Sequence, residues 1–207
     1  MIITMLYDSE EVNSRNLARE ATSWAESNGH EIIVFDANED PIAHCLGCFG
    51  CWIKTPGICV HTKDRGGDFL KSAIRGDYIL RITKITFGGY SSSLKNYTDR
   101  LIPLLHPYFM RLAGEMHHRP RYSRYPELLT IGWGAACPEE EATFKKLYKA
   151  NLLNFFERGA GQPLILPGNE AAWENKSGGE IESKTGRTAE WLSEKIGTGN
   201  IKQEAAV

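Results

Sequence analysis

Four of the five cysteines of this 207-residue chain lie within fifteen residues of one another. They are Cys45, Cys48, Cys51 and Cys59, in the spacing C-x2-C-x2-C-x7-C. Thiolates two residues apart in a turn can point at one centre, which is why such spacings recur at iron–sulfur and zinc sites. Gly47, Gly50 and the Pro56-Gly57 pair allow the backbone to turn around such a centre. The cysteines alone leave three alternatives open: an iron–sulfur cluster, zinc, or free thiols.

A second group of polar residues, Ser9, Asn13 and Ser14, follows a short apolar segment at the N-terminus. Hydroxyls, an amide side chain and free N–H groups at a helix N-terminus can hold a phosphate without a formal positive charge. Ordinary helix capping by Asp8 or Ser9, with Glu11 closing a capping box, accounts for the same residues equally well. The segment therefore predicts either a phosphate loop or a capped helix.

Two further segments combine glycines with aromatic residues. Phe87-Gly88-Gly89-Tyr90 places two glycines between two aromatic rings, and Trp133-Gly134 repeats the theme later in the chain. Glycines let backbone N–H groups approach a planar ligand, and aromatic rings offer it a stacking surface. The alternative for each segment is a turn whose aromatic residues belong to the core.

The segment 116–126 interleaves arginines and tyrosines with the pair His117-His118. Arginine and tyrosine could grip a nucleotide or a partner chain. No third metal ligand lies near the histidines in sequence, so they do not indicate a metal site. A solvated connector or a subunit contact is the preferred interpretation of this segment.

Apolar runs and helical periodicity alternate along the chain and supply the elements that must position these residues. The pattern predicts strands at 1–7, 31–36, 77–82, 128–133 and 162–166. It predicts a helix around 17–27 and further helices at 64–75, 92–112, 139–158 and 183–196. Such alternation is typical of an α/β fold with a parallel sheet covered on both faces, here a doubly wound three-layer sandwich.

In such a sheet, ligands bind beyond the carboxyl ends of the strands. The loops at 8–14, 37–63, 83–91 and 134–138 are therefore expected to converge on one rim. We expect a single domain over residues 1–197, with the cysteine-rich loop 37–63 inserted after the second strand. A disordered tail is expected at 198–207.

Composition narrows the function classes. A formal net charge of −2 gives no support for nucleic-acid binding. The N-terminus lacks the basic segment and cleavage site of a secretory signal, and no run approaches the ~20 apolar residues of a membrane span. Clustered cysteines, odd in number, suit a reducing compartment better than a disulfide framework. These features predict a cytoplasmic protein that binds neither nucleic acid nor membrane.

Three of these segments together resemble a known family. They are the Ser9-x-x-x-Asn13-Ser14 loop, the CxGCxxCW…TPGxC stretch from Cys45 to Cys59, and the FGGYSxxLKxxxDR stretch from Phe87 to Arg100. Over about residues 1–165 the chain resembles the NADPH-dependent FMN reductase and iron–sulfur flavoprotein branch of the flavodoxin-like superfamily. The resemblance implies a flavodoxin-like five-stranded parallel sheet in the order 2-1-3-4-5, with FMN at its carboxyl rim.

The resemblance also implies roles for individual residues. The FMN phosphate would be held by Ser9, Asn13 and Ser14. The flavin ring would be contacted by Thr86, Phe87, Gly88, Gly89 and Tyr90, with Gly134 on another side. In iron–sulfur members a 4Fe–4S cluster is ligated by four cysteines, which would here be Cys45, Cys48, Cys51 and Cys59. Two positions depart from the family pattern: the first loop is acidic where the family often has Ser-Pro-Arg, and Lys84 lies where a proline is usual.

The function implied is an FMN-binding oxidoreductase that takes electrons from NAD(P)H or a reduced carrier, with no side chain acting as acid or base. Its partner would be a small-molecule or protein redox acceptor. A homodimer or homotetramer is implied, helped by the helix that contains Lys95 and Asp99. Two alternatives remain: an electron carrier with a 4Fe–4S cluster on the four cysteines, and a non-catalytic flavodoxin-like scaffold that has lost FMN.

Overall fold

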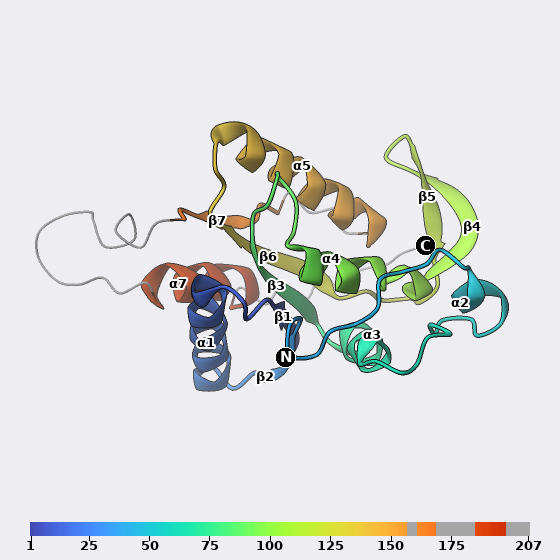
Figure 1. Cartoon of the computed structure of the whole chain (residues 1–207), viewed down its shortest axis with the longest axis horizontal. Helices are drawn as coiled ribbons and strands as arrows, with labels where there is room; N and C mark the ends of the chain where they lie inside the picture. The colour runs from blue at the N-terminus through green and yellow to red at the C-terminus, as the bar shows by residue number, and fades with distance from the viewer. Residues whose placement is uncertain (157–160, 169–184, 198–207) are drawn as a thin grey trace, which may run out of the picture.

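The structure is a computed structural model and describes residues 1–156, 161–168 and 185–197. Five parallel strands form its central sheet: β1 (Ile2–Tyr7), β2 (Glu31–Asp36), β3 (Tyr78–Lys84), β6 (Glu127–Trp133) and β7 (Leu164–Leu166). Their order is β2-β1-β3-β6-β7 (Figure 1). Because β6 and β7 are the fourth and fifth strands of this sheet along the chain, the predicted flavodoxin-like order 2-1-3-4-5 is confirmed. The tail expected at 198–207 lies outside the described residues.

Helices cover both faces of the sheet, because the central strands are apolar on both sides. One face packs against α1 (Val12–Ser27) and α7 (Thr185–Ile196), through a core that includes Leu17 and Leu192. The other face packs against α3 (Gly66–Arg75), α4 (Ser92–Asp99) and α5 (Pro138–Asn154). The three-layer sandwich predicted from the alternating pattern is thus present.

The predicted helix at 92–112 is wrong beyond its first two turns. Helix α4 ends at Asp99, a 3-10 turn covers Ile102–Leu104, and the chain then forms an antiparallel hairpin of β4 (Leu105–Leu112) and β5 (Glu115–Pro120). Pro103 and Pro107 explain the difference, because each lacks the N–H that a continuing helix needs and restricts the residue before it. The segment 116–126, predicted as a connector, therefore begins with a strand.

The cysteine-rich segment 37–63 contains one short helix, α2 (Gly50–Ile53), and otherwise runs without regular structure. It lies beside the β4–β5 hairpin, at the right-hand end of the molecule in Figure 1. Among the residues described, no helix has the length and apolar character needed to cross a membrane.

Candidate functional site

The carboxyl ends of the central strands lie level with one another. Tyr7, the last residue of β1, pairs with Asp36 on β2 and with Ile82 on β3, and Ile82 in turn pairs with Ile131 on β6. Side chains that follow adjacent strands therefore meet at one rim of the sheet. This rim is the candidate site.

Hydrogen bonds join the segments that follow β1, β3 and β6. The hydroxyl of Ser91 donates to Asp8 Oδ2 over 2.6 Å. The indole Nε1 of Trp133 donates to Ser14 Oγ over 3.0 Å, and the N–H of Ile85 donates to the carbonyl of Trp133 over 2.8 Å. The expected convergence of loops 8–14, 83–91 and 134–138 is therefore what the structure shows.

The N-terminus of α1 faces this rim without a cap. Its N-cap residue is Glu11, whose side chain makes no capping hydrogen bond, and the first turn holds no acidic residue. The Glu11 carboxylate instead pairs with Lys84 Nζ at 2.7 Å. The capping-box alternative is therefore wrong, and the first N–H groups of the helix are left for another acceptor.

Two buried acceptors at the rim have no hydrogen-bond partner among the described residues. They are Asp8 Oδ1 and Asn13 Oδ1, in side chains that are almost fully buried. Burial raises the pKa of Asp8, and the hydrogen bond from Ser91 partly offsets that rise. Unmet buried acceptors are costly unless a donor reaches them. The rim thus offers acceptors for hydroxyl groups beside a helix terminus that favours an anion.

The remaining phosphate-loop candidates, Ser9 and Ser14, are already engaged within the chain. Ser9 hydrogen-bonds the Asp36 carboxylate. Burial raises the pKa of Asp36, but the hydrogen bonds from Asn38, Ser9 and Tyr7 outweigh this effect, so the pKa is lowered. Ser14 is fully buried and receives the bond from Trp133. Ser14 is therefore held at the rim beside Trp133 at the end of β6, whereas Ser9 turns toward the end of β2.

The segment 86–89 is a two-residue turn, closed by hydrogen bonds in both directions between Thr86 and Gly89. Its central residues, Phe87 and Gly88, have positive φ angles of 50° and 73°. A phenylalanine with such a φ is strained, and Phe87 as a whole is 91% exposed. No acceptor is found within the described residues for the N–H groups of Phe87 and Gly88. The turn therefore presents one aromatic face and two amide donors.

Gly88 and Tyr90 have packing roles, and for Tyr90 the alternative of a core aromatic residue is the one that the structure shows. A Cβ atom on Gly88 would lie 2.7 Å from Thr143 Cβ on α5, so this glycine lets the turn rest against that helix. Tyr90 is buried, with its ring edge-on to Phe144 at 5.5 Å and the Arg81 guanidinium 4.8 Å above it. Among the predicted ring-contact residues, Phe87 is the one whose side chain is free to stack.

Gly134 directly follows β6, has a φ of 75° and donates its N–H to the carbonyl of Leu166 over 3.0 Å. A Cβ atom on it would lie 3.9 Å from Lys84 Cγ, which places it at the same rim as the turn that follows β3. Lys84 also lies over the Trp133 ring, 5.7 Å from its centroid. Gly134, Lys84 and Trp133 thus close the β6 side of the site.

The four clustered cysteines line one cavity of about 50 Å³. Burial raises the pKa of the Cys51 thiol, and the proximity of Cys59, Cys45 and Cys48 raises it further. All five cysteines of the chain are free thiols. Within the described ranges, no three His, Cys, Asp or Glu side chains are grouped closely enough to hold a metal ion as they stand.

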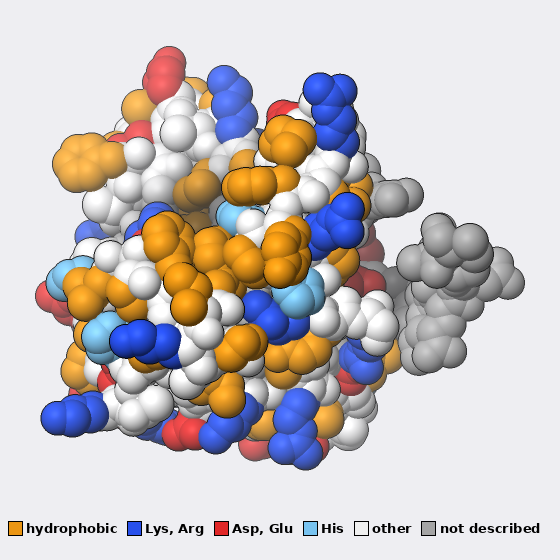
Figure 2. Space-filling view, turned by 90° about the vertical axis from the view of Figure 1, so that its right-hand side faces the viewer, with side chains coloured by type: hydrophobic (Ala, Val, Ile, Leu, Met, Phe, Trp, Pro, Cys, Tyr) orange, Lys and Arg blue, Asp and Glu red, His pale blue; other side chains and the backbone are white. Residues whose placement is uncertain are grey.

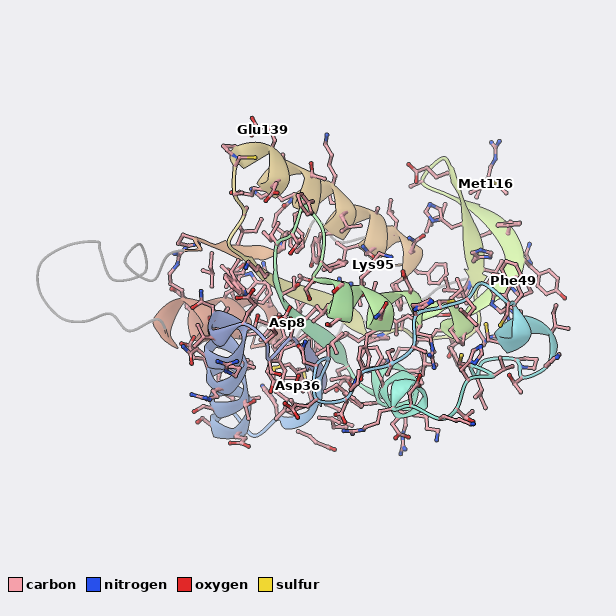
Figure 3. All side chains as sticks on the ribbon, in the orientation of Figure 1. Asp8, Asp36, Phe49, Lys95, Met116 and Glu139 are labelled. Atoms are coloured by element: carbon pink, nitrogen blue, oxygen red, sulfur yellow. The ribbon has the colours of Figure 1, made fainter. Side chains whose placement is uncertain are left out.

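This cavity is not at the rim, so the expected convergence holds only for the start of loop 37–63. There Asn38 Oδ1 accepts from the N–H of Glu10, and Asn38 Nδ2 donates to Ser93 Oγ, each over 3.4 Å. The walls of the cavity include Arg100, Ile102 and Pro103, which follow the C-terminal end of α4. Ser91, by contrast, lies at the N-terminal end of that helix, and eight helical residues span about 12 Å. Figure 3 accordingly shows Asp8 in the middle of the molecule and Phe49 of the cysteine segment at its far end.

Comparisons with known proteins give a structural likeness. No family model matches the chain, and no curated protein sequence matches it. The solved structure of azoreductase AzrA is 12% identical and superposes with a TM-score of 0.63, covering 94% of this chain and 100% of that one. The apo form of the NADH:FMN oxidoreductase EmoB is 12% identical, with a TM-score of 0.58, covering 94% and 89%.

A third solved structure is an FMN-dependent NADH-azoreductase from Bacillus anthracis in complex with FMN. It is 13% identical to this chain, with a TM-score of 0.53, and the match covers 93% of this chain and 95% of that one. At such identities the likeness establishes a shared flavodoxin-like fold. It spans nearly the whole length of each protein.

Proposed function

We propose that the protein is an FMN-dependent oxidoreductase that takes electrons from NAD(P)H or a reduced carrier and passes them to a small-molecule or protein acceptor. The observation that carries the proposal is the uncapped N-terminus of α1 beside the unmet acceptors of Asp8 and Asn13. FMN fits these groups, because its phosphate suits a helix N-terminus and its ribityl hydroxyls are donors. The likeness to FMN-dependent reductases supports the same cofactor.

Each group at the rim then has a task. The first N–H groups of α1 bind the phosphate, and Lys84 neutralises the nearby Glu11 carboxylate that would otherwise repel it. The exposed ring of Phe87 stacks on the flavin, and the free N–H groups of Phe87 and Gly88 donate to its polar edge. Bound FMN supplies the electron-transfer chemistry itself. No side chain of this site is needed as acid or base.

The decisive experiment is the titration of the apoprotein with FMN and with riboflavin, followed by flavin fluorescence. We expect tighter binding of FMN, because riboflavin lacks the phosphate, and FMN-dependent oxidation of NADPH or NADH. Equal affinity for both flavins would contradict the phosphate site. Binding of neither would leave the non-catalytic scaffold as the function.

A second candidate is an electron carrier with a 4Fe–4S cluster on Cys45, Cys48, Cys51 and Cys59. It is favoured by one observation, the opening of all four thiols into a single cavity. The thiols would have to close around the cluster, because they are not grouped tightly enough for a metal as they stand. Iron and acid-labile sulfide analysis of protein purified without oxygen tests this candidate. Stoichiometric zinc would contradict it.

We also propose that the protein is cytoplasmic, which the five free thiols support.

A further inference from the structure

The β4–β5 hairpin stands out from the body of the protein as a two-stranded antiparallel sheet. No third strand pairs with it among the described residues. A two-stranded ribbon is marginally stable by itself, and an open strand edge is a template for pairing with another chain. Within the described residues, the outer edges of both β4 and β5 are therefore without a paired strand.

The two edges differ. β4 carries Pro107 and an irregular register between Leu105 and Phe109, and both features obstruct pairing along its outer edge. β5 is in regular register from Glu115 to His118 and has its proline only at its last position, Pro120. The edge open to pairing is thus that of β5.

The turn of the hairpin determines which groups of β5 point outward. Ala113 and Gly114 form the turn with φ angles of 50° and 86°, so Leu112 and Glu115 exchange both hydrogen bonds next to it. Because hydrogen-bonded and non-hydrogen-bonded pairs alternate, the N–H and C=O groups of Met116 and His118 face away from β4.

The sequence of this edge complements itself. In an antiparallel pairing of two β5 strands about His117, Met116 lies opposite the partner's His118 and can exchange both backbone hydrogen bonds with it. Glu115 then lies directly opposite the partner's Arg119. Two opposite-charge pairs therefore form in each dimer, at the spacing where cross-strand charges interact.

The side chains around this edge are those of a contact surface. Tyr108, Phe109 and Met116 are each more than half exposed, although all three are large and apolar. The His118 ring stacks on Phe109 at 4.7 Å and lies 4.8 Å from the Trp52 ring. The partner's Met116 would cover this aromatic stack. Figure 2, which faces this end of the molecule, shows the hydrophobic side chains gathered there.

We propose that the β5 edge joins two copies of this chain into a symmetric dimer with a continuous four-stranded sheet. The arrangement is independent of the proposed function and differs from an interface at α4, the helix of Lys95 and Asp99. The chain that pairs with the β5 edge is a second copy of this protein, because the same edge supplies both members of each charge pair. To form the charge pair, the Arg119 side chain turns from the Phe109 carbonyl, which its Nε reaches over 3.2 Å, and Glu115 turns from His117.

Single charge reversals test the register. E115R places two arginines opposite each other in each pair, and R119E places two glutamates there. Sedimentation equilibrium of the full chain is expected to show about ten-fold weaker self-association for either variant, since two attractive pairs become repulsive. R19E is the matched control, because Arg19 is exposed on α1, in the body of the protein and away from the hairpin. We expect it to associate as the unmodified protein does.

Mixing the two single variants gives the decisive result. In the mixed dimer the arginine introduced at position 115 faces the glutamate introduced at position 119, and the native Glu115 faces the partner's Arg119. We expect the mixture, and the double variant E115R/R119E, to recover the original association. A loss caused by local misfolding, such as loss of the 3.4 Å contact between Glu115 and His117, would not be rescued by mixing.

Three outcomes would overturn the proposal. They are unchanged association of both single variants, failure of the mixture to recover, and an unmodified protein that is monomeric at all concentrations. An oligomer that persists unchanged in the charge variants would place the interface elsewhere, for example at α4.

Discussion

Arg100 and Asp64 form a two-pronged ion pair, with Nη1 3.0 Å from Oδ2 and Nη2 3.0 Å from Oδ1. The same guanidinium donates to the carbonyls of Ala43 and His61, at 2.9 and 3.0 Å. The Arg100 side chain is 1% exposed. One buried cation thus ties both ends of the cysteine segment to the end of α4, and it holds the cavity wall in place.

Replacing Asp64 with asparagine leaves Arg100 buried without its counter-charge. We expect D64N to lower the free energy of unfolding by about 3 kcal/mol at neutral pH, measured by urea denaturation. Cys51 should also react faster with a thiol reagent, because its segment loosens. D68N, an exposed carboxylate on α3, is the control and should change neither quantity.

The pH dependence of the same pair has a definite sign. Burial raises the pKa of Asp64, but the hydrogen bonds from Arg100 and from the N–H groups of Ala43 and Gly66 outweigh it, so the pKa is lowered from 3.8. The pair's contribution is therefore complete above pH 3.8 and is lost as the pH falls through the lower folded-state pKa. D64N should lack this acid-induced loss of stability. Parallel acid unfolding curves for both proteins would contradict the assignment.

For Asp8 we expect the opposite dependence of stability on pH. Burial raises its pKa above 3.8, so the folded state binds the proton more tightly and loses stability as the pH rises from 3.8 through the folded-state pKa. D8N should therefore unfold at higher urea concentration than the unmodified protein at neutral pH, with the difference shrinking near pH 4. FMN affinity should be retained, because the asparagine side-chain oxygen can still accept from a ribityl hydroxyl. Lower stability of D8N at neutral pH would count against this account.

Phe87 should show opposite effects on stability and on cofactor binding. F87G relieves a positive φ and removes an exposed ring, so the free energy of unfolding should rise by up to about 1 kcal/mol. The dissociation constant for FMN should increase about ten-fold, because stacking is lost. A113G relieves the same φ of 50° in the hairpin turn and is the control, with a gain in stability and no change in FMN binding. Unchanged FMN affinity in F87G would place the ring elsewhere.

Gly88 and Gly89 make a matched pair in one turn. A Cβ atom on Gly88 meets Thr143 Cβ at 2.7 Å and adds strain at a φ of 73°, whereas a Cβ atom on Gly89 meets its nearest neighbour at an ordinary 3.5 Å. Thermal unfolding should show G88A destabilised by about 2–4 kcal/mol and G89A by less than about 1 kcal/mol. A Gly88 variant that loses flavin is therefore not evidence of ring contact by itself. Equal stability of the two variants would contradict the packing role.

The strand and helix pattern of this fold could be predicted because it depends on local periodicity. Apolar runs at 1–7 and 31–36 and the helical spacing of Leu17 and Trp24 are properties of neighbouring residues, and right-handed crossovers then leave few sheet orders. The hairpin was missed although Pro103, Pro107 and Ala113-Gly114 signalled it. The apolar residues around them recur at helical spacing, which favoured a helix where the chain forms two strands.

By itself, the sequence determined which residue types stand at each strand end, including Asn13, Ser14 and the Phe87–Tyr90 turn. It also determined that four thiols lie close along the chain. Only the tertiary structure decided that Ser9 turns to Asp36, that Tyr90 enters the core, and that the thiols lie at the far end of α4. The physical reason is that the position and orientation of a side chain depend on contacts between residues distant in sequence. Trp133 meets Ser14 across 119 positions, and Arg100 holds both ends of a segment whose own sequence does not specify where it lies.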